Sequence, residues 1–210
     1  MSLEKLKNKK IVFFGDSITD SNRRLNPKYP MGFGFVSMVD TDYSINHSYA
    51  NITLINQGVS GDKTEELLAR INQDVIELNP DVVILLIGIN DIWHRYDQGL
   101  EINVKEIVDR INEVIIKIKN CGSEVIVMTP FLFPTNEHFE GLLPHLQELH
   151  KEIKKMVEYN LYASIDLYQV LSEYAKVRGN HTITLDSVHP TTFGHGIIAQ
   201  EIINYLWMNN

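Results

Sequence analysis

The chain has 210 residues, of which 44% are hydrophobic and 22% charged, a composition typical of one soluble globular domain over residues 1–210. Its 27 acidic and 19 basic residues give a formal net charge of −8, which disfavours nucleic acid or an anionic membrane as the main partner. The single cysteine excludes an intrachain disulfide, and residues 1–10 lack the apolar stretch of a signal peptide, so we expect a cytoplasmic protein.

Short apolar runs recur along the chain and predict strands. They are residues 11–14, 52–55, 82–87, 125–128 and, more weakly, 163–167. Runs of this length without polar alternation are typical of strands buried on both faces, as in a parallel sheet. Even the longest run, 82–87, is far too short to span a membrane.

Helical periodicity fills the intervals between these runs. Apolar residues share one helical face within residues 67–78, 104–118, 142–157 and 198–206. The last pattern follows Pro190-Thr191-Thr192, where a threonine can cap the helix start. This alternation predicts a three-layer α/β/α sandwich with a central, mostly parallel five-stranded sheet and right-handed crossovers.

Polar clusters follow the predicted strands, at residues 15–20, 56–62 and 88–91, and a further cluster lies near the C-terminus at residues 186–190. Ligands of parallel sheets bind beyond the carboxyl ends of the strands. We therefore expect all four clusters to meet at one rim of the sheet and to form the functional site.

These clusters contain what acyl transfer requires, namely a hydroxyl nucleophile, a base, a carboxylate that orients the base, and oxyanion donors. Ser17 lies in a tight turn opened by a glycine, and Asp186 and His189 are three residues apart in a loop before a helix. The backbone N–H groups of Ser17 and Gly61 and the side-chain amide of Asn90 can serve as oxyanion donors. Each signal alone has a plainer interpretation, such as a turn or a helix-capping pair, and their combination at the strand ends favours catalysis.

The chain resembles the SGNH or GDSL-like hydrolase family in four sequence blocks. The matching residues are Gly15-Asp16-Ser17, with Ile18 where leucine is common, then Gly61, then Gly88, Asn90 and Asp91, and finally Asp186, His189 and Pro190. The resemblance implies a flavodoxin-like three-layer fold and a triad of Ser17, His189 and Asp186. It also implies an oxyanion hole formed by Ser17, Gly61 and Asn90. The Gly-x-Ser-x-Gly elbow of other lipases is absent.

A narrower resemblance links residues 15–20, 87–97, 128–131 and 188–190 to intracellular bacterial acetylxylan esterases. It implies a small-molecule ester substrate, an acetylated xylo-oligosaccharide or similar sugar. Other ester chemistry at the same site remains open: a lysophospholipase, a thioesterase or a broad short-chain carboxylesterase. A non-catalytic binding module is the remaining alternative, and a homo-oligomer is also open.

Several side chains are candidate substrate contacts with a structural alternative. Trp93, in a segment interpreted as a loop, either meets the substrate or packs on the domain edge. Phe131, like Phe133, either lines the site or belongs to the loop core. Asp16 is a candidate substrate contact, although it is also typical of a turn. Arg95 and Asp97 either contact substrate or pair with each other.

No metal and no cofactor is predicted. His145 and His150 lie five apart on a predicted helix and so face different directions. His195 is expected at a helix start in a structural role. Cys121 is expected to be structural, because it ends a helical pattern and no general base is expected near its thiol.

Overall fold

The computed structural model describes residues 3–208, so the predicted domain of residues 1–210 extends past both ends of this range. The strands are β1 (Lys10–Gly15), β2 (Thr53–Gly58), β3 (Val82–Leu86), β4 (Glu124–Met128) and β5 (Ala163–Ile165). They form one five-stranded sheet in the order β2-β1-β3-β4-β5, and every pairing is parallel. The predicted parallel sheet is confirmed.

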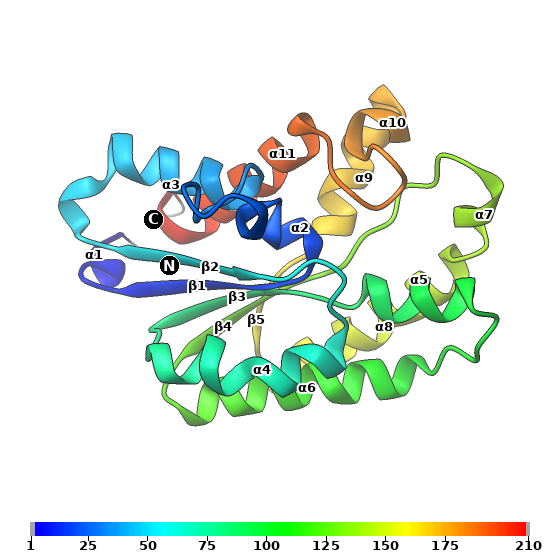
Figure 1. The fold of residues 1–210 in the computed structure, drawn as a ribbon, viewed down its shortest axis with the longest axis horizontal. Coiled ribbons are helices and arrows are strands. Elements are labelled where there is room, and N and C mark those ends of the chain that lie inside the picture. The colour runs from blue at the N-terminus through cyan, green and yellow to red at the C-terminus, as the bar shows by residue number, and fades with distance from the viewer. Residues whose placement is uncertain (1–2, 209–210) are drawn as a thin grey trace.

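Helices cover both faces of the sheet, which confirms the three-layer sandwich (Figure 1). One layer contains α3 (Phe35–Asn46), α9 (Leu167–Arg178) and α11 (Thr192–Ile203), and the other contains α4 (Thr64–Asp74), α6 (Val104–Asn120) and α8 (Leu143–Asn160). The shorter helices are α1 (Leu3–Leu6), α2 (Ser17–Asp20), α5 (Ile89–Asp97), α7 (Glu137–Glu140) and α10 (Asn180–Ile183). Within residues 3–208, no helix combines the length and apolar composition needed to span a membrane.

Single helical turns connect or extend several of these elements. They are η1 (Arg23–Leu25), η2 (Ser48–Ala50), η3 (Ile76–Leu78) and the π-helical turn η4 (Asn204–Met208). The predicted helix over 67–78 therefore divides into α4 and η3. The predicted pattern over 198–206 likewise divides between α11 and η4.

The helices α3 and α9 were not predicted from the sequence. The buried residues of α3 are Phe35, Val36, Val39 and Tyr43, a helical stripe interrupted by polar residues. The fifth predicted strand was too long, because Asp166 ends it. The Asp166 side chain accepts a hydrogen bond from the Gln169 N–H at 3.0 Å and caps α9, so Leu167 is helical.

The prediction for the segment after Asn90-Asp91 is also wrong. We expected a loop around Trp93, and the structure places this residue on the helix α5. The left-handed glycine that precedes this helix, Gly88 with φ of 123°, allows the chain to turn from the strand β3 directly into it.

The core lies between the sheet and its two helical layers. All five residues of the central strand β3 are buried, as are Phe13 and Phe14 of β1. Burial on both faces explains why these strands appear in the sequence as continuous apolar runs. The carboxyl ends of the strands all point to the same end of the molecule, where α2 and α5 begin (Figure 1).

Candidate active site

Ser17 occupies the first position of the helix α2, directly beyond β1. Asp16 caps this helix, since its side chain accepts a hydrogen bond from the Ile18 N–H at 3.0 Å. A Cβ atom on Gly15 would lie 2.3 Å from the Leu86 carbonyl oxygen of β3, so only glycine permits this close approach. The sequence thus ends the strand and turns the serine hydroxyl to the carboxyl edge of the sheet.

The loop that carries Asp186 and His189 returns on itself. Thr184 and Pro190 form an antiparallel bridge, and the Leu185 N–H donates to the His189 carbonyl oxygen at 2.8 Å. Ser187, at the tip of this loop, has a left-handed φ of 84°. This tight return places the two side chains next to each other.

The structure brings the three predicted catalytic side chains into one hydrogen-bonded chain. Ser17 Oγ lies 2.9 Å from His189 Nε2, and His189 Nδ1 lies 2.6 Å from Asp186 Oδ2. The other carboxylate oxygen, Oδ1, accepts hydrogen bonds from the backbone N–H groups of Val188 and His189 at 3.1 and 2.8 Å. This arrangement can transfer a proton from a serine hydroxyl to an imidazole held by a carboxylate.

The hydrogen bonds also determine the charge of Asp186. Partial burial alone would raise the pKa of this carboxyl, but the hydrogen bonds from His189 and Val188 outweigh it and hold the pKa below its ordinary value. The alternative that Asp186 caps the following helix is wrong. Thr191 caps α11, since its hydroxyl oxygen accepts from the Gly194 N–H at 3.0 Å, as the sequence predicted for a threonine.

The predicted oxyanion donors lie on three segments at the same edge. Asn90 is buried in the first turn of α5 and donates one N–H of its amide to the Asp62 carbonyl oxygen at 2.9 Å. A side-chain amide has a second N–H, which can face a ligand. Gly61 has a left-handed φ of 87°, with no heavy atom within 4 Å of a Cβ built on it. The backbone N–H groups of Ser17 and Gly61 donate to no other residue in the described part of the chain.

Arg70 is a residue that the sequence analysis missed. Its guanidinium donates to Asp62 Oδ2 at 2.6 Å and to the carbonyl oxygens of Gly15 and Gln57, both at 2.9 Å. It also lies over the ring of Phe14, 4.5 Å from the centroid. Arg70 therefore ties the carboxyl ends of β1 and β2 to the loop that carries the predicted oxyanion glycine. No sequence motif identifies Arg70, because in the sequence it is one of several polar residues of an amphipathic helix.

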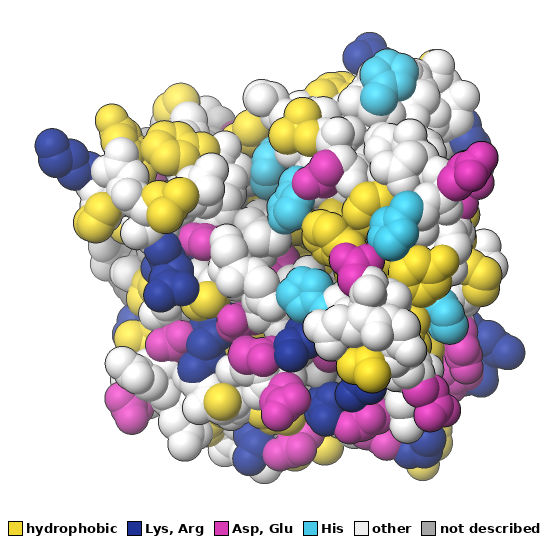
Figure 2. Space-filling view, turned by 45° about the vertical axis from the view of Figure 1, so that its right-hand side comes forward, with side chains coloured by type: hydrophobic (Ala, Val, Ile, Leu, Met, Phe, Trp, Pro, Cys, Tyr) yellow, Lys and Arg dark blue, Asp and Glu magenta, His cyan; other side chains and the backbone are white. Residues whose placement is uncertain are grey.

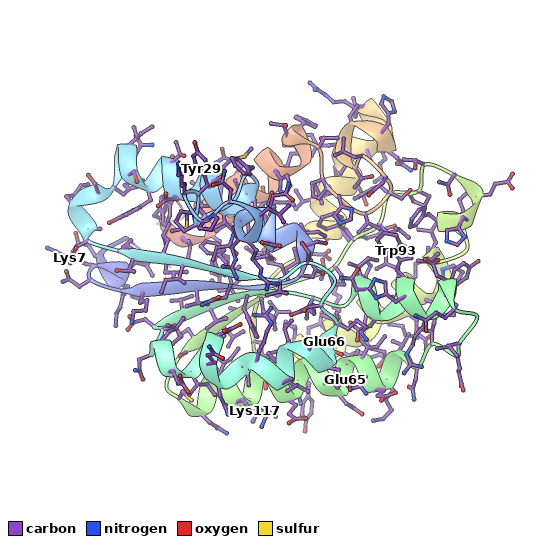
Figure 3. All side chains as sticks on the ribbon, viewed as in Figure 1. Lys7, Tyr29, Glu65, Glu66, Trp93 and Lys117 are labelled. Carbon is purple, nitrogen blue, oxygen red and sulfur yellow. The ribbon has the colours of Figure 1, made fainter. Side chains whose placement is uncertain are left out.

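The three candidate substrate contacts lie in different environments. Trp93 belongs to α5 and is half-buried (Figure 3). Its ring centroid lies 6.2 Å from that of His189 and 5.3 Å from that of Phe139, so the ring lies at the site and is also packed. Phe131 is fully buried, as Phe133 nearly is, which favours the loop-core interpretation for both.

Asp16 is fully buried beneath the serine turn. Burial raises the pKa of its carboxyl to about 7, because the charged form is poorly solvated. Its Oδ1 caps α2, and its Oδ2 has no hydrogen-bond partner within residues 3–208. This placement favours the turn-forming interpretation over a direct contact with substrate.

The expectation that Arg95 and Asp97 pair with each other is wrong. Arg95 donates to the Glu101 carbonyl oxygen at 3.0 Å, whereas Asp97 lies 2.8 Å from His138 Nε2. Positions two apart on a helix point in different directions, which separates the two side chains on α5.

A cavity of about 500 Å³ opens beside the hydrogen-bonded chain, with Ser17 and His189 in its lining. His195 lines it as well, from the start of α11 as predicted. Figure 2 shows several histidine side chains at this end of the molecule, beside hydrophobic surface. Among the described residues, no group of three or more His, Cys, Asp or Glu side chains could hold a metal ion.

Comparisons with known proteins find relatives that hydrolyse esters. The profile of the GDSL-like Lipase/Acylhydrolase family matches residues 13–197. An acetylxylan esterase of Geobacillus stearothermophilus is 28% identical over 96% of both chains, and an arylesterase of Vibrio mimicus is 26% identical over 70% of this chain and 69% of its own.

A solved structure of the Geobacillus acetylxylan esterase superposes on this chain with a TM-score of 0.84, at 28% identity and 93% coverage of each chain. Three solved variants of that enzyme are described as catalytic mutants, in which a serine, a histidine or an aspartate is replaced by alanine.

Proposed function

Since the chain belongs to the GDSL-like lipase/acylhydrolase family and is a carboxylic ester hydrolase of the SGNH type, we propose that Ser17 is its nucleophile and acetylated carbohydrate its substrate. The observation that carries the proposal is the continuous hydrogen-bonded chain from Ser17 Oγ through His189 to Asp186. Such a chain is what an acyl-serine mechanism needs before the substrate arrives.

In the proposed mechanism, Ser17 Oγ attacks the ester carbonyl carbon while His189 Nε2 accepts the hydroxyl proton. Asp186 stabilises the imidazolium that forms. The backbone N–H groups of Ser17 and Gly61 and the amide of Asn90 bind the oxyanion. His189 then returns the proton to the leaving alcohol. A water molecule deprotonated by His189 attacks the acyl-serine, which releases the acid and restores Ser17.

The substrate class rests on the relatives and on the space at the site. The acetylxylan esterase resembles this chain over nearly its full length, and its solved catalytic mutants replace the same three residue types. The Trp93 ring beside His189 provides an aromatic wall, which would restrict the acyl group on that side to a small size. A long acyl chain, as in a lysophospholipase or a thioesterase substrate, is the competing possibility.

The test combines covalent labelling with a chain-length series. A serine-directed fluorophosphonate should label the wild-type chain at Ser17 and leave Ser17→Ala unlabelled. Among p-nitrophenyl esters, acetate should give a higher kcat/KM than octanoate, and acetylated xylo-oligosaccharides should release acetate. Preference for octanoate would contradict the acetylesterase proposal, and a labelled Ser17→Ala variant would contradict the assignment of the nucleophile.

The cytoplasmic location stays a prediction, and the oligomeric state stays open. Cys121 is exposed as a free thiol, which is compatible with a reducing compartment.

A further inference from the structure

We infer that the cavity lined by Ser17, His189 and His195 receives the leaving alcohol of the ester, and that it is built for an uncharged, hydroxyl-rich alcohol such as a sugar. The inference rests on the proposed acetylesterase function. It adds the residues that recognise the alcohol, with Asn22 and His195 as its hydrogen-bonding groups and Phe33 as its apolar face.

The position of the cavity determines which part of the ester it can hold. In acyl transfer by a serine, the histidine that accepts the serine proton delivers it to the leaving oxygen, so the alcohol lies next to His189 Nε2. The cavity contacts His189 and continues along the 185–192 loop. Its volume of about 500 Å³ is in the range of small-molecule sites and accommodates a sugar ring.

His195 provides a directed hydrogen-bond donor to this cavity. Its Nδ1 accepts a hydrogen bond from the Phe35 N–H at 3.2 Å, so the proton of the neutral ring resides on Nε2. Burial lowers the pKa of His195 to about 4, and the ring therefore stays neutral near pH 7. The Nε2–H has no partner elsewhere in residues 3–208 and is not among the fully enclosed polar atoms. It can donate to a hydroxyl group of the ligand.

Asn22 and Ser21 form a left-handed pair at the cavity rim, with φ values of 65° and 40°. Asparagine tolerates this conformation better than most other residues do. Gly32 and Gly34 leave room for the segment. Added Cβ atoms would lie 2.5 Å from the Asp20 carbonyl oxygen at Gly32 and 2.6 Å from Ser21 Oγ at Gly34.

The side chains of this left-handed pair are unused inside the protein. Neither the Asn22 amide nor the Ser21 hydroxyl forms a side-chain hydrogen bond to another described residue, and both line the cavity. An amide offers two donors and an acceptor, which suits the hydroxyl groups of a sugar.

The remaining lining distinguishes a neutral alcohol from an anionic one. Phe33 is 54% exposed and Leu185 is 73% exposed, so both offer apolar surface to the carbon-bound hydrogens of a sugar ring. Among residues 3–208, no lysine or arginine lines the cavity, and Asp186 is the one acidic residue in its lining. A phosphate-bearing alcohol or thiol would meet no cation there, which disfavours lysophospholipids and coenzyme-linked thioesters.

The test compares two acetate esters that form the same acetyl-Ser17 and differ only in the alcohol, namely a mono-O-acetylated methyl xyloside, whose other hydroxyl groups are free, and ethyl acetate. Asn22→Gly removes the amide and keeps the left-handed backbone without strain. The ratio of kcat/KM for the sugar acetate to kcat/KM for ethyl acetate should fall about three- to tenfold, as expected for one or two lost hydrogen bonds. Asn79→Gly, at an exposed left-handed asparagine before β3, is the matched control and should leave the ratio unchanged.

The outcomes of this test distinguish a failure of the alcohol subsite from a failure of the proposed function. A ratio that Asn22→Gly leaves at the wild-type value overturns the alcohol subsite and leaves the proposed esterase intact. A wild-type enzyme that cleaves ethyl acetate and no sugar acetate overturns both the subsite and the carbohydrate substrate. A wild-type enzyme that cleaves neither acetate overturns the proposed function itself.

Discussion

Left-handed backbone at single residues accompanies the candidate site. Gly61 carries a predicted oxyanion N–H, Ser187 lies between the predicted base and its carboxylate, and Asn22 lines the cavity. Sparsely populated backbone conformations are retained where the surrounding structure fixes them, and they are common at functional sites. The sequence identified the glycine of this group, because glycine adopts positive φ freely, but it did not identify the serine or the asparagine.

Asn90 is the side chain whose removal tests the oxyanion hole most directly. Asn90→Ala should lower kcat on p-nitrophenyl acetate by about a hundred- to a thousandfold, the usual effect of losing one oxyanion donor. Initial rates measure the effect, and circular dichroism with a thermal melt checks that the variant folds. A folded variant with turnover near wild type would remove Asn90 from this role.

Asp16 gives a prediction about the pH dependence of stability. Its folded pKa of about 7 exceeds its ordinary value of 3.8, so between these pH values the folded state holds a proton that the unfolded state has released. Ionisation of Asp16 therefore lowers the wild-type free energy of unfolding as the pH rises through this window. Asp16→Asn retains an oxygen for the Ile18 N–H and does not ionise.

The stability of Asp16→Asn relative to wild type should accordingly increase from pH 5 to pH 8. Urea denaturation of both proteins at each pH measures this difference, in which any pH-independent cost of the substitution cancels. A difference that stays constant between the two pH values would show that Asp16 has no raised pKa.

At the scale of elements, two consecutive residues of α5 fasten it to the loop and helix that follow β2. Asn90 donates to the Asp62 carbonyl oxygen, and the carboxylate of Asp91 accepts hydrogen bonds from the Thr64 N–H and hydroxyl. Arg70 of α4 then joins this loop to β1. The predicted oxyanion donors on separate segments are thereby held in one rigid arrangement.

Asp91→Ala should loosen this arrangement. The loss of acceptors for the buried Thr64 groups should cost about 1–3 kcal/mol of stability and should lower kcat more than it changes KM, because Asp91 acts as a positioning residue for Asn90. Asp91→Asn, which keeps one acceptor oxygen, should recover part of kcat. Equal kcat values in the folded alanine variant and the wild type would contradict the positioning role.

The start of α11 depends on its cap. Thr191→Ala removes the hydroxyl that accepts from the Gly194 N–H and should lower the free energy of unfolding by about 1 kcal/mol. Thr191→Ser keeps the hydroxyl and should stay within a few tenths of wild type. Chemical denaturation of the three proteins compares them, and a serine variant as unstable as the alanine variant would argue against the cap.

For the whole molecule, stability comes from the sheet buried between two helical layers. Leu85 lies in the central strand β3 and is 1% exposed, so Leu85→Ala should cost about 2–5 kcal/mol through lost burial and the cavity that remains. Leu100→Ala, at a leucine that is 52% exposed, should cost far less. Urea midpoints of the two variants measure the contrast, and similar midpoints would contradict this account of the core.

Local sequence patterns determined the architecture and the candidate residues. Apolar runs predicted the parallel sheet because its strands are buried on both faces, as the burial of β3 confirms. Polar blocks at strand ends identified Ser17, Asp186 and His189, since parallel strands direct their carboxyl ends to one edge. The helix α3 was missed because polar residues interrupt its apolar stripe, and α9 because its first leucine continues an apolar run.

Contacts between distant segments were decided by the tertiary structure alone. Three such contacts join residues far apart in the chain. They are the hydrogen bonds of the Arg70 guanidinium, the pairing of Asp97 with His138, and the cavity lined by Asn22 and His195. Periodicity and spacing report which face of a helix or strand is buried, and they carry no information about which side chain packs opposite. The sequence by itself therefore determined the fold and the chemistry that is proposed here, whereas folding decided the charge environment and the shape of the site.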